Sequence, residues 1–105
     1  MTDAYVKLAK DTIESYIENG EIINIPFNLP EEMYTTRAGA FVSLHIAGRL
    51  RGCIGTVSST TSSVAEEIRQ NAISAATRDP RFDPVRPDEL GALEYSVDVL
   101  AEAED

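Results

Sequence analysis

The sequence is short of the residues from which disulfides and metal centres are built. Its 105 residues include one cysteine, Cys53, one histidine, His45, and no tryptophan. A single cysteine excludes an internal disulfide and is typical of a reducing compartment. One Cys and one His also fall short of the roughly three protein ligands of a catalytic zinc site unless carboxylates complete the set. We therefore predict neither a metal site nor a cofactor.

Long apolar runs are absent as well. No stretch approaches the roughly 20 apolar residues that cross a bilayer. The N-terminus lacks the basic, apolar and small-residue succession of a secretory signal. We expect a cytoplasmic protein that does not associate with a membrane. The length indicates one domain over residues 1–105, which is enough chain for a single hydrophobic core.

Basic side chains are scarce, and they are unevenly distributed. The formal net charge is −9. Residues 1–36 carry two basic and seven acidic side chains, residues 37–86 carry seven and four, and residues 87–105 carry none and seven. This charge balance disfavours nucleic acid as a partner, since phosphate binding depends on basic surface. The basic middle segment is compatible with a local site for a small anion, although its arginines could instead pair with the flanking acids.

Apolar residues at helical spacing predict two helices. The first begins at a cap supplied by Thr2 or Asp3 and ends at Asn19-Gly20. The second begins at Ser63, which forms a capping box with Glu66, and ends before Pro80 because the residue preceding a proline avoids the helical region.

Alternating residues predict three strands. They cover residues 40–46, 50–57 and 94–100, and residues 47–49 join the first two as a hairpin. Residues 21–36 contain two prolines and are predicted to form an extended arm. The order helix, hairpin, helix, strand indicates an α+β fold of two layers with a small, mainly antiparallel sheet.

The lone cysteine lies in the hairpin, within "LRGCIGT" (residues 50–56). Directly opposed residues of a hairpin share a face. A three-residue loop pairs Ile46 with Leu50, His45 with Arg51, Ser43 with Cys53 and Val42 with Ile54. The less apolar face is then expected to carry Ser43, His45, Arg51 and Cys53.

Two interpretations of Cys53 remain open. In the first, Arg51 lowers the pKa of an accessible thiol, Gly52 and Gly55 let a ligand approach, and Cys53 is a candidate catalytic nucleophile. In the second, Cys53 is a small buried side chain and the glycines admit a crossing chain. His45 would lie diagonally to Cys53, roughly 7–8 Å away between backbones, so the spacing does not indicate a Cys–His pair.

The segment "RDPRF" (residues 78–82) follows the second predicted helix. Arg78 and Arg81 suit the negative end of the helix dipole, which is sufficient to explain them. The spacing of "GCIG" occurs in an RNA-binding fold, but here it lies in a strand and contains no basic residue.

Two stretches together resemble the AMMECR domain family. They are "GAFVSLHIAGRLRGCIGT" (residues 39–56) and "NAISAATRDPRFDPV" (residues 71–85), and the order of elements also fits along nearly the whole chain. The resemblance implies an α/β domain in two lobes, with "LRGCIG" lining a cleft between them. The family's domain continues beyond the last strand predicted here, so the chain corresponds to its N-terminal part. We expect a homo-oligomer formed through an uncovered sheet edge.

The resemblance also implies partners, but no established reaction. Prokaryotic members are the A component of the AmmeMemoRadiSam set, which implies a Memo-like protein and a radical SAM protein as partners in a modification pathway. We predict a ligand-binding or adaptor module. One alternative is a thiol-dependent enzyme or redox protein that uses Cys53. The other is an RNA-associated protein. The sequence therefore leaves open whether the chain is an enzyme. The predicted binding residues are Ser43, His45, Arg51, Gly52, Gly55, Arg78, Asp79 and Arg81.

Overall fold

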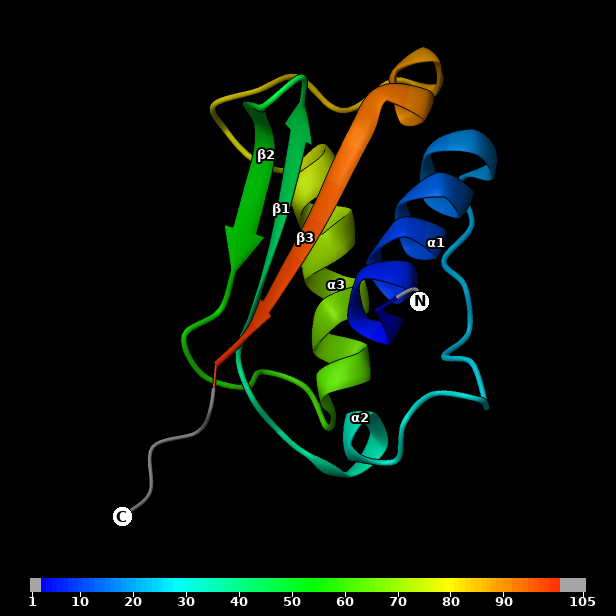
Figure 1. The fold of residues 1–105 in the computed structure, drawn as a ribbon, viewed down its shortest axis with the longest axis vertical. Coiled ribbons are helices and arrows are strands. Elements are labelled where there is room, and N and C mark those ends of the chain that lie inside the picture. The colour runs from blue at the N-terminus through cyan, green and yellow to red at the C-terminus, as the bar shows by residue number, and fades with distance from the viewer. Residues whose placement is uncertain (1–2, 101–105) are drawn as a thin grey trace.

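The computed structural model describes residues 3–100 and has helices on one side of a small sheet (Figure 1). The elements, in chain order, are α1 (Ala4–Asn19), α2 (Glu32–Thr35), β1 (Ala40–Ile46), β2 (Arg49–Gly55), α3 (Val64–Thr77), the 3₁₀ helix η1 (Pro87–Ala92) and β3 (Leu93–Val99). The three strands form one antiparallel sheet in the order β2-β1-β3. The predicted α+β fold is therefore confirmed.

Both long helices begin at predicted cap residues and end within a few residues of the predicted stops. The Asp3 carboxylate accepts a hydrogen bond from the Tyr5 N–H at 2.8 Å, and Gly20 ends α1 with φ 69°. The Ser63 hydroxyl accepts from the Glu66 N–H at the start of α3. None of the helices described in residues 3–100 is long and apolar enough to cross a membrane.

Two short helices were not predicted. The expectation that residues 21–36 are extended throughout was wrong over α2, and η1 lies in a segment that reads as turns. Each short helix inserts one apolar side chain into the core, Met33 from α2 and Leu90 from η1. Contacts with the rest of the molecule, rather than a periodic pattern of their own, therefore stabilise these short helices.

The hairpin register differs from the prediction at its turn. Ser43 pairs with Cys53, as expected, but the register shifts beside His45, which pairs with Leu50 instead of Arg51. The turn has two residues, Ala47 and Gly48, with φ 51° and 79°. Positive φ at both positions is typical of a type I′ turn, which matches the twist of the strands. The extra residue that this shorter turn leaves in β2 forms a bulge.

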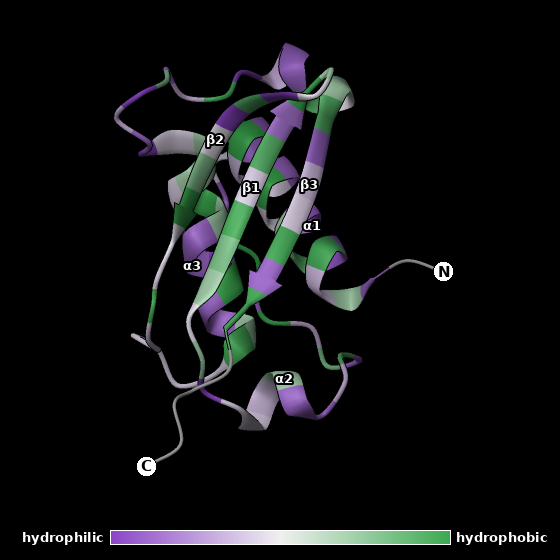
Figure 2. Ribbon diagram, turned by 60° about the vertical axis from the view of Figure 1, so that its left-hand side comes forward, coloured by the Kyte–Doolittle hydropathy of each residue, from purple (hydrophilic) through white to green (hydrophobic). Residues whose placement is uncertain are grey.

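The core lies between the sheet and the helices. The alternate residues Val42 and Leu44 of β1 are fully buried against them. The principal helical contributions are Leu8, Ala9 and Ile13 from α1 and Ile68, Ala72 and Ala75 from α3. Figure 2 shows α1 and α3 behind the sheet, and in Figure 1 α3 lies behind the strands with α1 beside β3; no described segment covers the front face in either view. The intervening strand residues therefore form an uncovered face.

Candidate functional site

The motif cysteine lies on the uncovered face, at the β2 end of a row that crosses all three strands. Ser43 of β1 pairs with Cys53 of β2 on one side and with Ser96 of β3 on the other. The neighbouring row contains Phe41 between Gly55 and Asp98. The row of Cys53, Ser43 and Ser96 therefore consists of small side chains.

Cys53 has a free, half-buried thiol. Its Sγ lies 3.3 Å from the hydroxyl oxygen of Ser43, and either group can donate in this contact. The structure therefore provides the sulfur with one polar neighbour on its own face of the sheet. This arrangement agrees with neither extreme of the two interpretations, because the thiol is neither fully exposed nor enclosed in the core.

The outer border of β2 is occupied by the predicted site residues Asp79 and Arg81. The Asp79 carboxylate is 4% exposed and accepts the Cys53 N–H at 3.0 Å. The same carboxylate accepts from the Arg81 guanidinium at 2.8 Å and from its backbone N–H at 3.0 Å. Hydrogen bonds from Arg81 hold the pKa of Asp79 well below its usual range, against the opposing effect of burial. Asp79 therefore stays ionised and positions Arg81.

Arg81, rather than Arg51, is the cation beside the cysteine. The Arg81 side chain is 57% exposed, and its Nη2 lies 3.5 Å from the Cys53 carbonyl oxygen. The hydrogen bond to Asp79 raises the pKa of Arg81, and the charge of a Cys53 thiolate raises it further. An exposed guanidinium held by a buried carboxylate can still bind an anion through its free N–H groups.

The expectation that Arg51 activates the thiol is not met. The Arg51 guanidinium makes a two-pronged ion pair with Glu89, with both N···O distances 2.9 Å, and donates to the carbonyls of Asp83 and Pro84. Hydrogen bonds from Arg51 lower the pKa of Glu89 to about 2 despite its partial burial. Arg51 therefore attaches η1 and the preceding loop to the bulge of β2.

The two motif glycines are explained by close packing within the chain. A Cβ on Gly52 would lie 2.3 Å from the carbonyl oxygen of Ala75 in α3. A Cβ on Gly55 would lie 2.3 Å from the aromatic ring of Phe41 on the uncovered face. Gly52 thus admits a crossing helix, and Gly55 admits a side chain of the neighbouring strand.

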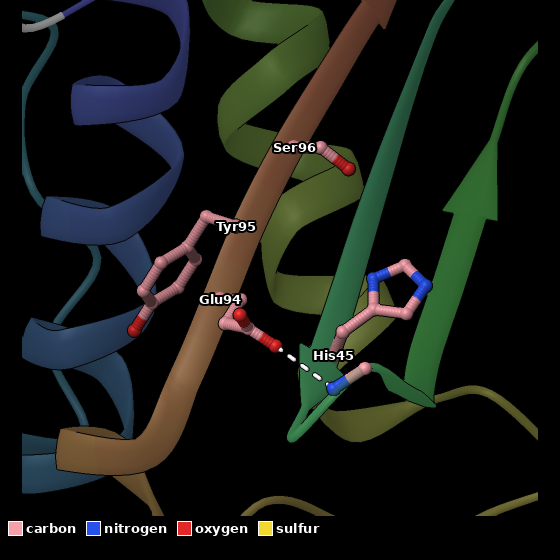
Figure 3. A pocket seen from close by; sticks show the side chains of 5 residues that line it. His45, Glu94, Tyr95 and Ser96 are labelled. Atoms are coloured by element: carbon pink, nitrogen blue, oxygen red, sulfur yellow. Dashed lines mark hydrogen bonds between the residues drawn. The ribbon is translucent and has the colours of Figure 1, made fainter.

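His45 lies at one end of the uncovered face, two positions along β1 from Ser43, the hydrogen-bond partner of the thiol. It lines a hollow of about 180 Å³ together with Gly48, Glu94 and Ser96 (Figure 3). The Glu94 carboxylate closes one side by accepting the Gly48 N–H at 3.1 Å.

Tyr95 also borders the hollow, but Figure 3 shows its ring on the opposite side of β3, toward α1. Burial, with the charges of Glu14 and Asp11, raises the pKa of Tyr95 to about 12.

Arg78 does not join this group. Its side chain lines a separate hollow against α3, with Arg69 and Ile22. The structure therefore brings together four of the predicted site residues, Ser43, Cys53, Asp79 and Arg81, and separates Arg51 and Arg78 from them.

A buried carboxylate that sequence reasoning missed holds the loop that follows β2. Glu67 is fully buried and accepts from the hydroxyls of Thr56, Thr60 and Thr61 at 2.7, 2.9 and 2.7 Å. It also accepts the backbone N–H groups of Thr60 and Thr61, both at 3.0 Å. Burial alone would raise the pKa of Glu67, but the hydrogen bonds outweigh it and lower the pKa to about 2. Asn71 extends this network to the Ala40 carbonyl.

The uncovered face has a gradient of charge across its strands. Arg81 lies at the border of β2, whereas β3 contributes the exposed carboxylates of Glu94 and Asp98. An anion is therefore favoured near Cys53 and disfavoured near β3. Within residues 3–100, no three Cys, His, Asp or Glu side chains come together as metal ligands. The site provides a hydroxyl, a thiol and a guanidinium, which are groups that bind and orient a ligand.

Comparison with known proteins identifies relatives over almost the whole chain. The family description AMMECR1 matches residues 6–105. A protein of Thermotoga maritima is 52% identical over 101 residues, which cover 95% of this chain and 58% of that protein. Protein CA_C1420 of Clostridium acetobutylicum is 50% identical over 103 residues, covering 97% of this chain and 22% of its own length.

A solved structure shares the fold. The crystal structure of the uncharacterised protein PH0010 from Pyrococcus horikoshii superposes with a TM-score of 0.83 at 35% identity, covering 90% of this chain and 48% of that one. The chain thus spans about half of PH0010 and 58% or less of the two relatives named above. The extent of the family match, the identities and the shared fold lead to one conclusion: the chain belongs to the AMMECR1 family.

Proposed function

We propose that this chain is a ligand-binding or adaptor module whose uncovered sheet face receives a small anionic group. The observation that carries this proposal is the group formed by Cys53, Ser43 and the exposed Arg81 guanidinium at one border of that face. Arg81 would hold the anion through its free N–H groups, and the Ser43 hydroxyl would orient it. The small central row of Cys53, Ser43 and Ser96 leaves space above the strands for such a group.

The partners in this proposal follow from the family resemblance. We propose that the chain acts with a Memo-like protein and a radical SAM protein in a modification pathway in the cytoplasm. Exposed strand residues on a face that no described segment covers support a role in docking. The predicted homo-oligomer would use the β3 border of the sheet, since Asp79 and Arg81 occupy the β2 border at Cys53.

The proposal can be tested by blocking the face. Ser96 is exposed and belongs to the central row, so Ser96→Arg adds a bulky side chain without displacing buried atoms. We expect purified Memo-like and radical SAM proteins from the same organism to bind the unmodified chain and to lose at least about tenfold in affinity for Ser96→Arg. The control Glu18→Arg places the same side chain at an exposed position near the end of α1 and should bind normally. Absence of binding to the unmodified chain, or equal loss in both variants, would contradict the adaptor role.

A thiol-dependent reaction is the second candidate, favoured by the 3.3 Å contact between the Cys53 sulfur and the Ser43 hydroxyl. A hydroxyl that donates to a thiolate stabilises it. The pH dependence of Cys53 alkylation in the folded protein separates the two candidates. Rapid alkylation with a midpoint well below about 8.5 supports a nucleophile, and Ser43→Ala should then raise the midpoint. A thiol that stays inert until unfolding supports a binding role.

A further inference from the structure

A second hollow lies on the other side of the molecule from the uncovered sheet face, along α3. Its volume is about 230 Å³, and it is lined by Ile22, Arg69, Gln70, Ile73, Ser74 and Arg78. It combines an apolar part, from Ile22 and Ile73, with two guanidinium groups. No carboxylate lines it.

Both arginines of this hollow lack an acidic partner among the residues that the structure describes. Three other arginines, Arg51, Arg81 and Arg86, form ion pairs with carboxylates. Over residues 3–100, no carboxylate lies within ion-pairing distance of Arg69 or Arg78. In a protein with net charge −9, two unpaired guanidinium groups converging on one hollow form a local basic site.

One of the two guanidinium groups is held in place before any ligand arrives. Arg69 Nη1 donates to the carbonyl of Ile23 at 2.9 Å, which ties the arm after α1 to α3 and positions the guanidinium beside Ile22. The remaining N–H groups of Arg69 make no hydrogen bond within residues 3–100. Arg78 follows the last turn of α3, and its exposed side chain is free to close on a ligand.

We propose that this hollow binds a carboxylate that carries a short apolar group. A guanidinium presents two parallel N–H donors that match the two oxygens of a carboxylate. Ile22, which is 59% exposed, and Ile73 would contact the apolar part, which gains from leaving water. The carboxylate can belong to a free small acid or to the C-terminus of a polypeptide that ends in an apolar residue. This site is independent of the function proposed for the sheet face.

Titration of the amide resonances of the chain with hexanoate tests the proposal. A ligand with eight non-hydrogen atoms is expected to bind with a Kd on the order of 1 mM and to shift the resonances of Ile22 and residues 69–78. Hexan-1-ol has the apolar chain without the charge, and inorganic phosphate has the charge without the chain. Both should bind at least about tenfold more weakly. Equal binding of either probe, or no saturable shift with hexanoate, would overturn the proposal.

Matched variants assign the binding to the hollow. Arg78→Gln removes one exposed guanidinium and should weaken hexanoate about tenfold, with Arg78→Lys intermediate because it keeps the charge and loses the paired donors. Arg49→Gln removes the same charge from the exposed first residue of β2, next to the hairpin turn, and should leave the Kd unchanged. Equal effects of Arg78→Gln and Arg49→Gln would contradict a local site.

Peptides identify the source of the carboxylate. A short peptide ending in leucine with a free C-terminus should bind more tightly than hexanoate if the natural ligand is a polypeptide end, and its amidated form should then bind weakly. If hexanoate and the free peptide bind equally, the site takes small free acids. Equal binding of the free and amidated peptides would refute carboxylate recognition.

Discussion

The two faces of the sheet are built from alternate residues of the same strands, yet they have different properties. The covered face presents Val42 and Leu44, fully buried, to α3. The uncovered face presents Ser43, Cys53 and Ser96 in one row, none of them fully buried. The comparison shows that one set of residues supplies the burial energy that maintains the fold, which leaves the other set available for binding.

The glycines of "LRGCIG" divide between the two faces in the same way. Gly52 faces α3, where the carbonyl oxygen of Ala75 occupies the space that a Cβ would need. Gly55 faces the open side, where the obstacle is the ring of Phe41. A backbone obstacle cannot move without shifting a helix, whereas a side chain on an open face can change its rotamer. The two glycines should therefore differ in their tolerance of substitution.

The largest contrast between the faces is expected from truncating neighbouring residues of β1. Leu44→Ala leaves a cavity in the core and should lower the free energy of unfolding by about 3 kcal/mol. His45→Ala, on the uncovered face, should change it by less than about 1 kcal/mol. Urea denaturation measures both values. Similar losses for the two variants would mean that the uncovered face is also packed.

Glu67 is a charged residue buried on the covered side of the sheet. Removing its charge should lower the free energy of unfolding nearly as much as Leu44→Ala does. Glu67→Gln replaces an acceptor oxygen with an amide donor that faces the Thr56, Thr60 and Thr61 donors, so the free energy of unfolding at pH 7 should fall by about 2–3 kcal/mol. Glu66→Gln provides a neighbouring control at a solvent-accessible position of the same helix turn and should cost less than about 1 kcal/mol.

The same carboxylate predicts how stability depends on pH. The pKa of Glu67 is about 2 in the folded protein, below its ordinary 4.5. The unfolded chain therefore binds the proton first, so this contribution is complete above about pH 4.5 and is lost as the pH falls toward 2. Glu67→Gln should have a shallower decline than the unmodified chain over this interval. Identical slopes of stability against pH for the two proteins would show that the threonine donors do not lower the Glu67 pKa.

A smaller difference is expected between the two glycines. Gly52→Ala should lower the free energy of unfolding by about 2 kcal/mol because the helix must move away from β2. Gly55→Ala should cost less than about 1 kcal/mol because the Phe41 ring can rotate toward solvent. Thermal unfolding of the two variants gives the ranking. The reverse order would place the rigid contact on the uncovered face.

The smallest effect is expected at the centre of the uncovered face. Ser43→Ala and Cys53→Ala should each change the free energy of unfolding by less than about 1 kcal/mol. A double-mutant cycle should give a coupling below about 0.5 kcal/mol for their 3.3 Å contact, since both groups remain accessible to water. A larger coupling would assign this pair a role in maintaining the fold.

Sequence periodicity was sufficient to predict the helices and strands that bury one regular face. The caps at Asp3 and Ser63 and the alternation in β1 are local signals, so the two long helices and the Ser43–Cys53 pairing could be predicted. The turn could not, because its first residue is Ala47 with φ 51°, a conformation that alanine rarely adopts. Because the turn is shorter, Arg51 does not pair with His45, and its guanidinium forms an ion pair with Glu89 instead.

The site contacts that the sequence does not indicate join distant parts of the chain. Asp79 reaches Cys53 across 26 positions, and neither its own segment nor the hairpin indicates the contact. Glu67 resembles the solvent-facing acidic residues that are common in the first turn of a helix. Only the folding of residues 56–61 over that turn encloses it. In both cases the sequence shows the residue type but not the groups that surround it.

The ion pair of Asp79 and Arg81 has a consequence for how the protein avoids misassembly. A sheet that ends on a bare strand offers free N–H and C=O groups to strands of other molecules. At Cys53 the carboxylate already accepts the strand's N–H, and the guanidinium lies beside its C=O. A foreign strand would have to displace a buried charge to pair there. The residues that follow α3 therefore also protect the border of β2 against aggregation.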